Sequence, residues 1–390
     1  MARIDCSGEV YGAGGPGLFM LGRAEEAGEK LLQSHAGKVR LIYLDPPFGT
    51  GDTFAVKSGP KGKSVKIPAY ADNLSQDKYM EMMHKVLTLC KELLTPDGTI
   101  YLHVDYRMAA YLKIMMDEIF GRKNFVNEII WAYKSGGRAT KHFSRKHDDI
   151  LVYRKGASNY FDIISVGIPR GPERRNHMKQ QVDEEGRVYY SIRSGGKVYK
   201  YYEDSLVFPS DVWTDIEHLH QRDPERTGYS TQKPEALLKR IILASSQEGD
   251  IVADLFSGSG TTAAAAAKLG RRWIAADASP AALMTLRKRL LDYHSDTSMF
   301  AMDHRMEIRY LTDAQGGKKP DVTVKREKDG FAVCPNEALS YIAAGHMKDG
   351  AFAAESYDTA PVPGKKLAVK GERLTLLVSD LYGNISVWEY

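Results

Sequence analysis

Short apolar runs and helical periods divide the chain into regular and irregular stretches. Four apolar runs predict strands, at 39–44, 99–104, 128–133 and 148–153. Apolar positions at helical spacing predict helices over 75–94 and 106–120. Strands that alternate with helices along a chain form an α/β sheet. The first part of the chain is therefore predicted to be an α/β layer structure.

The same alternation returns after a stretch with a different pattern. Between about 155 and 225 there is no sustained helical period, and Tyr, Arg and Lys are frequent, so we expect an irregular inserted module. Regular elements resume with a helix from Pro234, strands at 251–254 and 271–277, and helices at 261–269 and 281–293. From about 305 onward, strand patterns and a hairpin turn predict a small β-rich extension.

These changes of pattern predict four segments. Residues 1–133 and 228–304 are expected to form the two halves of one α/β domain. An insert over 134–227 separates the halves, and the β-rich extension covers 305–390.

Composition places the chain among ordinary soluble globular proteins. It has 390 residues, of which 43% are hydrophobic and 27% charged. No apolar run approaches the roughly 18 residues of a membrane span, and the first residues lack a signal peptide's apolar stretch. Cys6, Cys90 and Cys334 are far apart, which argues against a disulfide framework or a zinc site and fits a reducing cytoplasm. His218-x-His220 lacks further convincing ligands, so no metal is expected.

A glycine loop follows the strand that ends in Asp254. Gly258 and Gly260 precede a helix, a layout in which glycines admit a ligand to the backbone and the helix start favours negative charge. Asp277 ends the next strand, where a carboxylate can accept hydrogen bonds from ribose hydroxyls. The spacing is not that of a dinucleotide loop, since Thr261 and Thr262 follow Gly260. We expect a nucleoside-type cofactor; a tight strand-to-helix turn is the alternative.

Asp45-Pro46-Pro47-Phe48 directly follows the strand at 39–44. The lone pair of a base's exocyclic amine is delocalised into the ring, so the amine is a poor nucleophile. The Asp45 carboxylate and a backbone carbonyl near Pro46 are suited to accept hydrogen bonds from that amine, and the prolines fix these acceptors in place. Phe48 is suited to stack on a base flipped out of a duplex. The alternative is a strand-terminating turn.

Taken in this order, the segments resemble the S-adenosylmethionine-dependent DNA amino-methyltransferases of the permuted β group. In that group the catalytic motif comes first, then a target-recognition region, then the cofactor motif. The similarity covers about residues 17–304 and is closest to type III restriction–modification methyltransferases and solitary adenine-specific relatives. The matching segments are 45–48 (catalytic), 231–235 (before the cofactor motif), 249–262 (cofactor motif) and 277–280 (ribose acid), with 143–148 as a further family segment.

The resemblance implies a Rossmann-like methyltransferase sheet, S-adenosyl-L-methionine as cofactor and a prokaryotic cytoplasm with activity at the nucleoid. The implied catalytic residues are Asp45, Pro46, Pro47 and Phe48. The implied cofactor contacts are Lys233, Asp254, Phe256, Ser257, Gly258, Ser259, Gly260, Thr261, Thr262 and Asp277.

Three positions depart from the family pattern. Leu255 stands where Pro is usual, and Phe48 replaces the commoner Tyr, which keeps the stacking ring but loses a hydroxyl. Arg23 stands where the family usually has an Asp near the cofactor adenine. Arg23 therefore implies either an altered cofactor affinity or an acid supplied from elsewhere.

The insert carries the charge expected of a nucleic-acid contact. Residues 134–200 hold 15 Lys and Arg against 7 Asp and Glu, a net charge of +8 compared with +4 for the whole chain. Basic side chains neutralise phosphates, and Arg also reads guanine edges. A solvated basic surface is the alternative. Ser135-Gly136-Gly137-Arg138 is interpreted as a hinge, a phosphate-contacting loop or a flexible connector.

The function expected from these features is site-specific methylation of adenine N6 in double-stranded DNA by base flipping and direct transfer. Cytosine N4 is the alternative target, since the same acceptors serve either amine. A catalytically silent DNA-binding subunit of the same fold is a second hypothesis, and RNA or protein as substrate is a third. A homodimer and a separate restriction subunit stay open as partners, and no membrane is expected.

Overall fold

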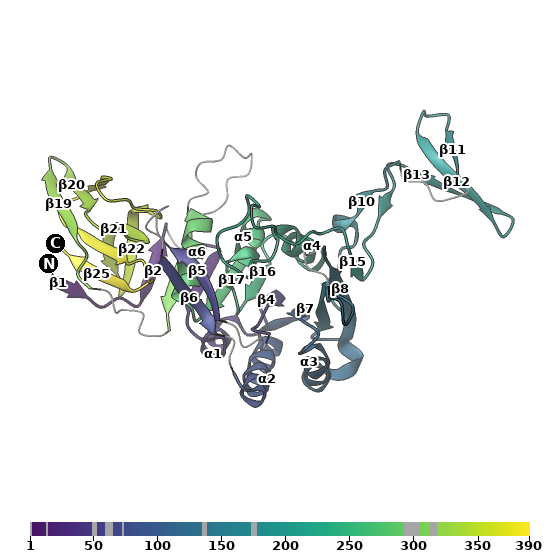
Figure 1. Cartoon of the computed structure of the whole chain (residues 1–390), viewed down its shortest axis with the longest axis horizontal. Helices are drawn as coiled ribbons and strands as arrows, with labels where there is room; N and C mark the ends of the chain where they lie inside the picture. Colours follow the sequence, from purple (N-terminus) through teal and green to yellow (C-terminus); the bar gives the residue numbers. More distant parts are fainter. Residues whose placement is uncertain are drawn as a thin grey trace.

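Among the described residues, fifteen strands form one continuous sheet, and the remaining strands form smaller sheets (Figure 1). The computed structural model describes residues 2–12, 15–48, 53–58, 65–71, 74–134, 139–172, 178–291, 305–311 and 318–390. The strand order is β1-β25-β24-β21-β22-β2-β18-β3-β17-β16-β4-β7-β9-β8-β15.

The middle of this sheet is parallel, as an α/β fold requires. Its parallel strands are β18 (Met306–Tyr310), β3 (Gly17–Leu21), β17 (Arg272–Asp277), β16 (Ile251–Asp254), β4 (Val39–Leu44) and β7 (Leu94–Val104). Then β9 (His147–Arg154) and β8 (Phe125–Ala132) continue the sheet in antiparallel fashion. Strands from both predicted halves lie side by side in the parallel part, and β18, from the segment predicted as the extension, joins them. The predicted α/β fold class is confirmed, and the division into two halves of one domain stays a prediction.

Helices cover both faces of the parallel strands (Figure 1). Leu41 and Tyr43 of β4 share a core with α4 (Glu235–Ser245), α5 (Thr261–Lys268) and α6 (Pro280–Leu291). Ile42 and Leu44 share the other core with α1 (Ala24–His35), α2 (Gln76–Leu93) and α3 (Ala109–Met116). Side chains alternate between the faces of a strand, so burial on both sides explains the continuous apolar runs of the sequence.

The helix expected over 106–120 is shorter than predicted. The regular part, α3, ends at Met116 and passes into a π-helical turn, η1 (Asp117–Gly121), and a 3-10 turn, η2 (Arg122–Asn124). Gly121 has φ 90°, a left-handed conformation that ends the helix. The apolar period alone did not reveal this change of helix type.

The insert contains more regular structure than expected. Strands β11 (Lys179–Val182), β12 (Val188–Ser194) and β13 (Lys197–Tyr202) form an antiparallel sheet that stands away from the rest of the molecule (Figure 1). A short pair, β10 (Ile168–Pro169) and β14 (Leu206–Val207), lies at its base, and β15 (Val212–Trp213) returns to the edge of the main sheet beside β8. We call residues 168–207 the arm. A 3-10 turn, η3 (Ile164–Val166), precedes it.

The C-terminal region is β-rich, as predicted, and continues the main sheet. Strand β2 (Gly8–Tyr11) pairs with β18 on one side and with β22 (Ala351–Asp358) on the other. Beyond them lie β21 (Tyr341–Lys348), β24 (Thr375–Ser379), β25 (Ile385–Glu389) and β1 (Ala2–Ile4). A second sheet holds β19 (Val322–Glu327), β20 (Gly330–Pro335) and β23 (Leu367–Lys370). Strand β1 pairs with β25, and β2 pairs with β22, so the start of the chain joins the sheet of the C-terminal region. The four predicted segment limits stay predictions.

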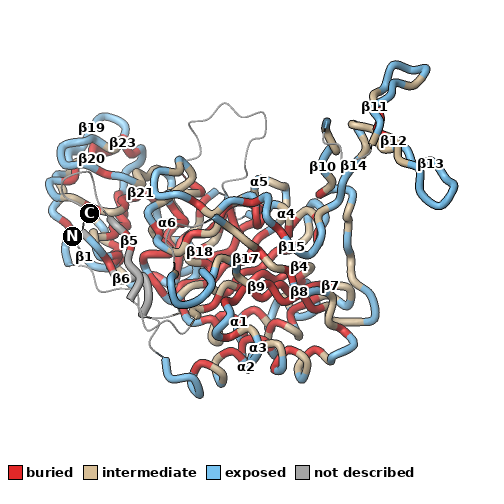
Figure 2. Tube along the Cα trace, turned by 45° about the vertical axis from the view of Figure 1, so that its right-hand side comes forward, coloured by how far each residue is buried: buried red, intermediate tan, exposed pale blue. Residues whose placement is uncertain are grey.

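A buried polar cluster lies where the extension joins the methyltransferase-like core. The Glu9 carboxylate on β2 pairs with the Arg287 guanidinium on α6 and accepts hydrogen bonds from the hydroxyls of Tyr11 and Tyr310. The Tyr11 and Tyr341 hydroxyls lie 2.7 Å apart. Glu9 and Arg287 are both buried, so each needs the other as a counter-ion (Figure 2 shows the burial along the chain).

The remaining hairpin is β5 (Thr53–Ser58) with β6 (Val65–Ala71). No helix in the described part of the chain is long and apolar enough to cross a membrane. The described residues hold no group of three or more His, Cys, Asp or Glu arranged to bind a metal ion.

Candidate active site

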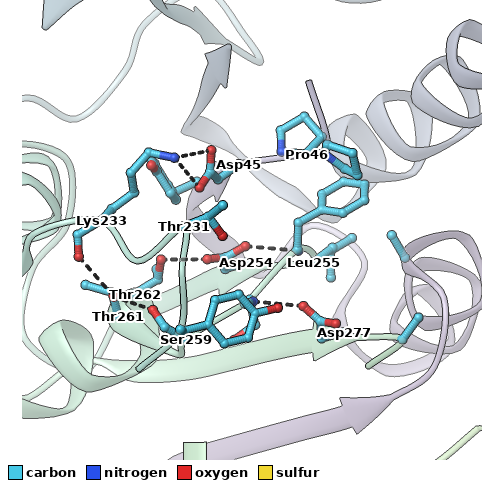
Figure 3. Close-up of a pocket in the computed structure, with 18 of the residues that line it drawn as sticks. Asp45, Pro46, Thr231, Lys233, Asp254, Leu255, Ser259, Thr261, Thr262 and Asp277 are labelled. Atoms are coloured by element: carbon cyan, nitrogen blue, oxygen red, sulfur yellow. Dashed lines mark hydrogen bonds and ion pairs between the residues drawn. The ribbon is translucent and has the colours of Figure 1, made fainter. Parts of the chain in front are cut away.

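A cavity of about 240 Å³ lies at the carboxyl ends of β4, β16 and β17 (Figure 3). Neighbouring parallel strands end at one edge of a sheet, so Asp45, Asp254 and Asp277 come together there. All four predicted catalytic residues line the cavity: Asp45, Pro46, Pro47 and Phe48. The predicted cofactor residues that line it are Lys233, Asp254, Phe256, Ser257, Gly258, Ser259, Thr261, Thr262 and Asp277. Gly260 caps α5 instead.

Asp254 holds the glycine loop from inside. Its carboxylate accepts a hydrogen bond from the Thr262 hydroxyl at 2.6 Å and another from the Phe256 N–H at 3.0 Å. The side chain is buried, and this burial raises the pKa of Asp254 to about 7 despite the two hydrogen bonds. Both ends of the loop are thus tied to one carboxyl group.

The two glycines of the loop have conformations that favour glycine. Gly258 has φ 49° and Gly260 has φ 74°, both in the left-handed region. A Cβ at Gly260 would also lie 3.0 Å from Leu286 Cδ1. The chain therefore turns tightly from β16 into α5 and exposes its backbone to the cavity.

Asp277 faces the cavity from the end of β17. Its two carboxylate oxygens accept hydrogen bonds from the Gly258 N–H and the Ser279 N–H, both at 2.8 Å. Burial raises the pKa of Asp277 to about 6. These bonds fix the carboxylate and leave lone pairs for further donors, such as a pair of ribose hydroxyls.

Asp45 is paired with a lysine from the other half of the sequence. Lys233 Nζ lies 2.7 Å from Asp45 Oδ1 and 2.5 Å from Asp45 Oδ2. The same Nζ is 5.1 Å from the centroid of the Phe48 ring. The predicted contact of Lys233 with a cofactor stays a prediction; in this structure its ammonium contacts the predicted catalytic residues.

A buried hydrogen-bond network around His103 contacts Phe48. Sequence analysis did not predict this network. The His103 ring stacks on Phe48 with centroids 6.2 Å apart. His103 Nδ1 lies 2.8 Å from the Tyr43 hydroxyl and Nε2 lies 3.1 Å from Asp148 Oδ2. The Tyr133 hydroxyl donates to Asp148 Oδ1 at 3.1 Å.

The charge of Asp148 is maintained within this network. Burial alone would raise its pKa, but hydrogen bonds from His103 and Tyr133 and the nearby Lys233 charge lower the pKa of Asp148 below its usual value. Tyr43, His103 and Asp148 belong to β4, β7 and β9, and Tyr133 directly follows β8. The only signal in the sequence was the family-like segment 143–148, which ends in Asp148.

Glu25 places an acid close to the unusual Arg23. Both residues line the cavity, and Arg23 Nη2 lies 3.1 Å from Glu25 Oε1. The Arg23 side chain is largely exposed, whereas that of Glu25 is mostly buried. A carboxylate is therefore present in the part of the cavity where Arg23 replaces the family's usual acid.

The arm carries basic side chains paired with aromatic rings. The Arg170, Arg187 and Lys200 charges lie 4.7, 4.6 and 4.8 Å from the ring centroids of Tyr201, Tyr202 and Tyr189, respectively. The segment 135–138, interpreted as a hinge, a phosphate-contacting loop or a connector, lies outside the described residues. So does 173–177, which holds the basic side chains Arg174, Arg175 and His177 of the insert. The functional role predicted for the insert stays a prediction.

The sequence was compared with known protein families, and one family model matches the region that holds most of the cavity residues. The sequence profile of the N6/N4 methyltransferase family, described as DNA methylase, matches residues 39–288. Type II methyltransferase M.EcaI of Enterobacter cloacae is 33% identical over 299 residues, covering 65% of this chain and 64% of that protein. DNA adenine methyltransferase YhdJ of Escherichia coli K12 is 31% identical over 243 residues, covering 61% of this chain and 71% of that protein.

Type III modification subunits are also among the relatives. The probable HindVI modification subunit of Haemophilus influenzae is 27% identical over 371 residues, covering 66% of this chain and 48% of that protein. Among solved structures, the PvuII DNA methyltransferase (cytosine-N4-specific) has a TM-score of 0.47 and 16% identity, covering 76% of this chain and 91% of that chain.

Proposed function

The chain belongs to the DNA methylase family, and on that premise we propose that it transfers a methyl group from S-adenosyl-L-methionine to adenine N6 in double-stranded DNA. The observation that carries this proposal is one cavity lined both by Asp45 and Phe48 and by the glycine loop and Asp277. An amine acceptor and a nucleoside-type site are thus adjacent, as direct transfer between two bound molecules needs.

The residues around the glycine loop fit the cofactor. Asp277 is fixed with lone pairs free for ribose hydroxyls, and Gly258 lets a ligand approach the backbone. Ser257 Oγ is buried at the cavity and has no hydrogen-bond partner within the described part of the chain. Burying such a group costs free energy unless a ligand satisfies it. Glu25 is the acid we assign to the cofactor's adenine.

The chemistry of the proposed reaction is a direct transfer. S-Adenosylmethionine supplies the electrophilic methyl group. The Asp45 carboxylate accepts a hydrogen bond from the target amine, which favours a pyramidal nitrogen whose lone pair can attack. Pro46 and Pro47 hold the backbone acceptor in place, and Phe48, supported by His103, stacks on the flipped base. A new N–C bond would form as the S–C bond breaks, which would leave S-adenosylhomocysteine. The methylated amine would then release one proton to solvent.

Adenine is preferred to cytosine on two grounds. The Asp-Pro-Pro-aromatic tetrapeptide favours adenine in the family that the sequence resembles, and the relative from Escherichia coli is named an adenine methyltransferase. Cytosine N4 is the alternative, since the family profile covers both amines.

Two surfaces are proposed to contact the duplex. The arm supplies basic and aromatic side chains, which suit phosphates and base edges. The loop 139–146 precedes β9, and β9 begins beside the end of β7, at the same sheet edge as the cavity. Phe143 in this loop is 98% exposed. The exposed Lys141 and Arg145 and the half-buried Lys146 lie beside it. The Arg145 guanidinium lies 4.3 Å from the centroid of the Tyr106 ring.

The relatives support proposals for the partners of the protein and for its location in the cell. The type III modification subunits support a separate restriction subunit, and a homodimer is the other assembly that we propose to test. The bacterial relatives support a prokaryotic cytoplasm.

The experiment that tests the function is expression in a bacterial host without DNA methyltransferases of its own, followed by sequencing that detects modified bases. We expect N6-methyladenine at one short sequence motif. N4-methylcytosine would overturn the choice of base. An unmodified genome, from cells whose purified protein binds S-adenosylmethionine by calorimetry, would overturn the proposed reaction. Absence of cofactor binding would favour a catalytically silent DNA-binding subunit, the alternative to which Arg23 points.

A further inference from the structure

Lys233 connects the cofactor half of the site to the catalytic tetrapeptide. Its backbone carbonyl accepts a hydrogen bond from Thr261 Oγ1 at 3.2 Å, at the start of α5. Its side chain reaches Asp45, 188 residues earlier in the chain. The two side chains of this ion pair are 12% and 18% exposed, so the pair is largely protected from solvent.

The ammonium group occupies the acceptors that the proposed reaction needs. Both Asp45 oxygens contact Lys233 Nζ, at 2.7 and 2.5 Å. A protonated amine and a base's exocyclic amine are both N–H donors and compete for the same carboxylate lone pairs. Lys233 Nζ also lies over Phe48, the ring proposed to stack on the base. An incoming amine therefore competes with this ammonium for the Asp45 oxygens and for the space over the Phe48 ring.

An empty site without this lysine would be electrostatically unfavourable. The raised pKa of Asp254 comes mainly from burial, and the Asp45 charge contributes to it. The Lys233 charge is near enough to lower the pKa of Asp148, together with the stronger effects of its hydrogen bonds. A positive charge at this point thus compensates several carboxylates until a substrate enters.

We propose that Lys233 stands in for the target amine in the empty site, and that a base with an exocyclic amine displaces its ammonium from Asp45 on entry. Lys233 is then a positioning residue whose ammonium competes with the base amine for Asp45. A base without the amine leaves the ion pair intact, because it offers Asp45 no donor in exchange. The inference rests on the proposed function, since it assumes that the base amine binds Asp45.

The test compares two DNA duplexes and several proteins. Both duplexes carry the motif mapped by genome sequencing; one has adenine at the target position and the other has purine, which lacks the 6-amino group. Dissociation constants are measured by fluorescence anisotropy without cofactor. Lys233→Met and Lys233→Gln remove the charge, Lys233→Arg keeps it, and Lys239→Met changes an exposed lysine on α4 as the matched control.

We expect the neutral Lys233 variants to bind the adenine duplex about tenfold more tightly than the wild type does, with little change for the purine duplex. Lys233→Arg and Lys239→Met should behave as the wild type does. The inference is overturned if both neutral variants fold, as judged by thermal unfolding, but show an unchanged or reduced preference for adenine. A chain that modifies no motif at all would instead refute the proposed function, so the two failures are distinguishable.

Discussion

Three aspartates lie at the ends of three neighbouring strands, and each has different hydrogen-bond partners. Asp254 is tied to its own loop, Asp277 faces the cavity with two backbone donors, and Asp45 is paired with Lys233. Their positions were predictable because each directly follows or ends an apolar strand. The partner of Asp45 was not, because a contact across 188 residues leaves no local pattern in the sequence.

If Asp277 binds the cofactor, its raised pKa should make cofactor binding depend on pH. Burial raises the pKa of Asp277 to about 6, so the carboxylate is ionised and accepts hydrogen bonds above that pH and becomes protonated below it. We expect the affinity for S-adenosylmethionine to be constant above pH 7 and to fall toward about tenfold per pH unit well below the pKa. Calorimetry between pH 5 and 8 measures this. The Asp277→Asn variant should bind S-adenosylmethionine more weakly, and its affinity should not fall at low pH. If its affinity fell as much as that of the wild type, another group would cause the pH dependence.

Glu25 pairs with Arg23 and lines the cavity beside it. If it holds the cofactor's adenine, Glu25→Gln should weaken S-adenosylmethionine binding about tenfold, the size expected for a hydrogen bond to a charged group. Glu29→Gln is the matched control, because Glu29 lies on the same helix and pairs with Lys85 at the surface. Equal cofactor affinities for the wild type and Glu25→Gln, measured by calorimetry, would exclude this role.

At the scale of elements, the sequence predicted the parts that carry strong local patterns. The apolar strands, the glycine loop and α5 were predicted because period and turn residues define them within a few positions. The arm was missed as sheet because its strands have little apolar core of their own and their aromatic residues alternate with basic ones. The network around His103 was missed because its members, Tyr43, His103, Tyr133 and Asp148, come from separate parts of the chain.

The loop before β9 gives a prediction for base flipping. If Phe143 fills the gap left by the flipped base, Phe143→Ala should reduce the fluorescence rise of 2-aminopurine at the target position, because the unstacked state loses its apolar replacement. Phe143→Trp should retain the rise, and Phe161→Ala, at another exposed Phe, serves as control.

A mispaired target base tests this role of Phe143 more sharply. Flipping a mismatched base costs less free energy, so a mismatch should restore the signal of Phe143→Ala. If the loss were equal for matched and mismatched duplexes, Phe143 would serve general DNA binding instead.

At the scale of the whole molecule, the extension and the core share one sheet. Strand β2, from the start of the chain, lies between β18 and β22, and the Glu9–Arg287 pair bridges β2 and α6. Strand patterns in the sequence predicted β structure after residue 305. They did not reveal that residues 2–11 pair with it, because strand pairing over more than 300 residues has no sequence period.

The buried Glu9–Arg287 pair is expected to be needed for stability. Glu9→Gln leaves the Arg287 guanidinium buried without a counter-ion and should lower the free energy of unfolding by about 3–5 kcal/mol. Glu327→Gln, which removes one partner of an exposed pair with Lys366, should cost less than about 1 kcal/mol. Urea unfolding measures both. Similar small losses for the two variants would show that the buried pair does not tie the extension to the core.

The most direct test of the central claim is mass spectrometry of nucleosides from unmethylated DNA of mixed sequence, incubated with the protein and S-adenosylmethionine carrying a labelled methyl group. The wild type should give labelled N6-methyladenine. Asp45→Asn should give at least about a hundredfold less, because the acceptor that activates the amine is weakened. The variant should still bind the cofactor, since Asp277 and the glycine loop are intact. An Asp45→Asn protein that methylates as fast as the wild type would contradict the account.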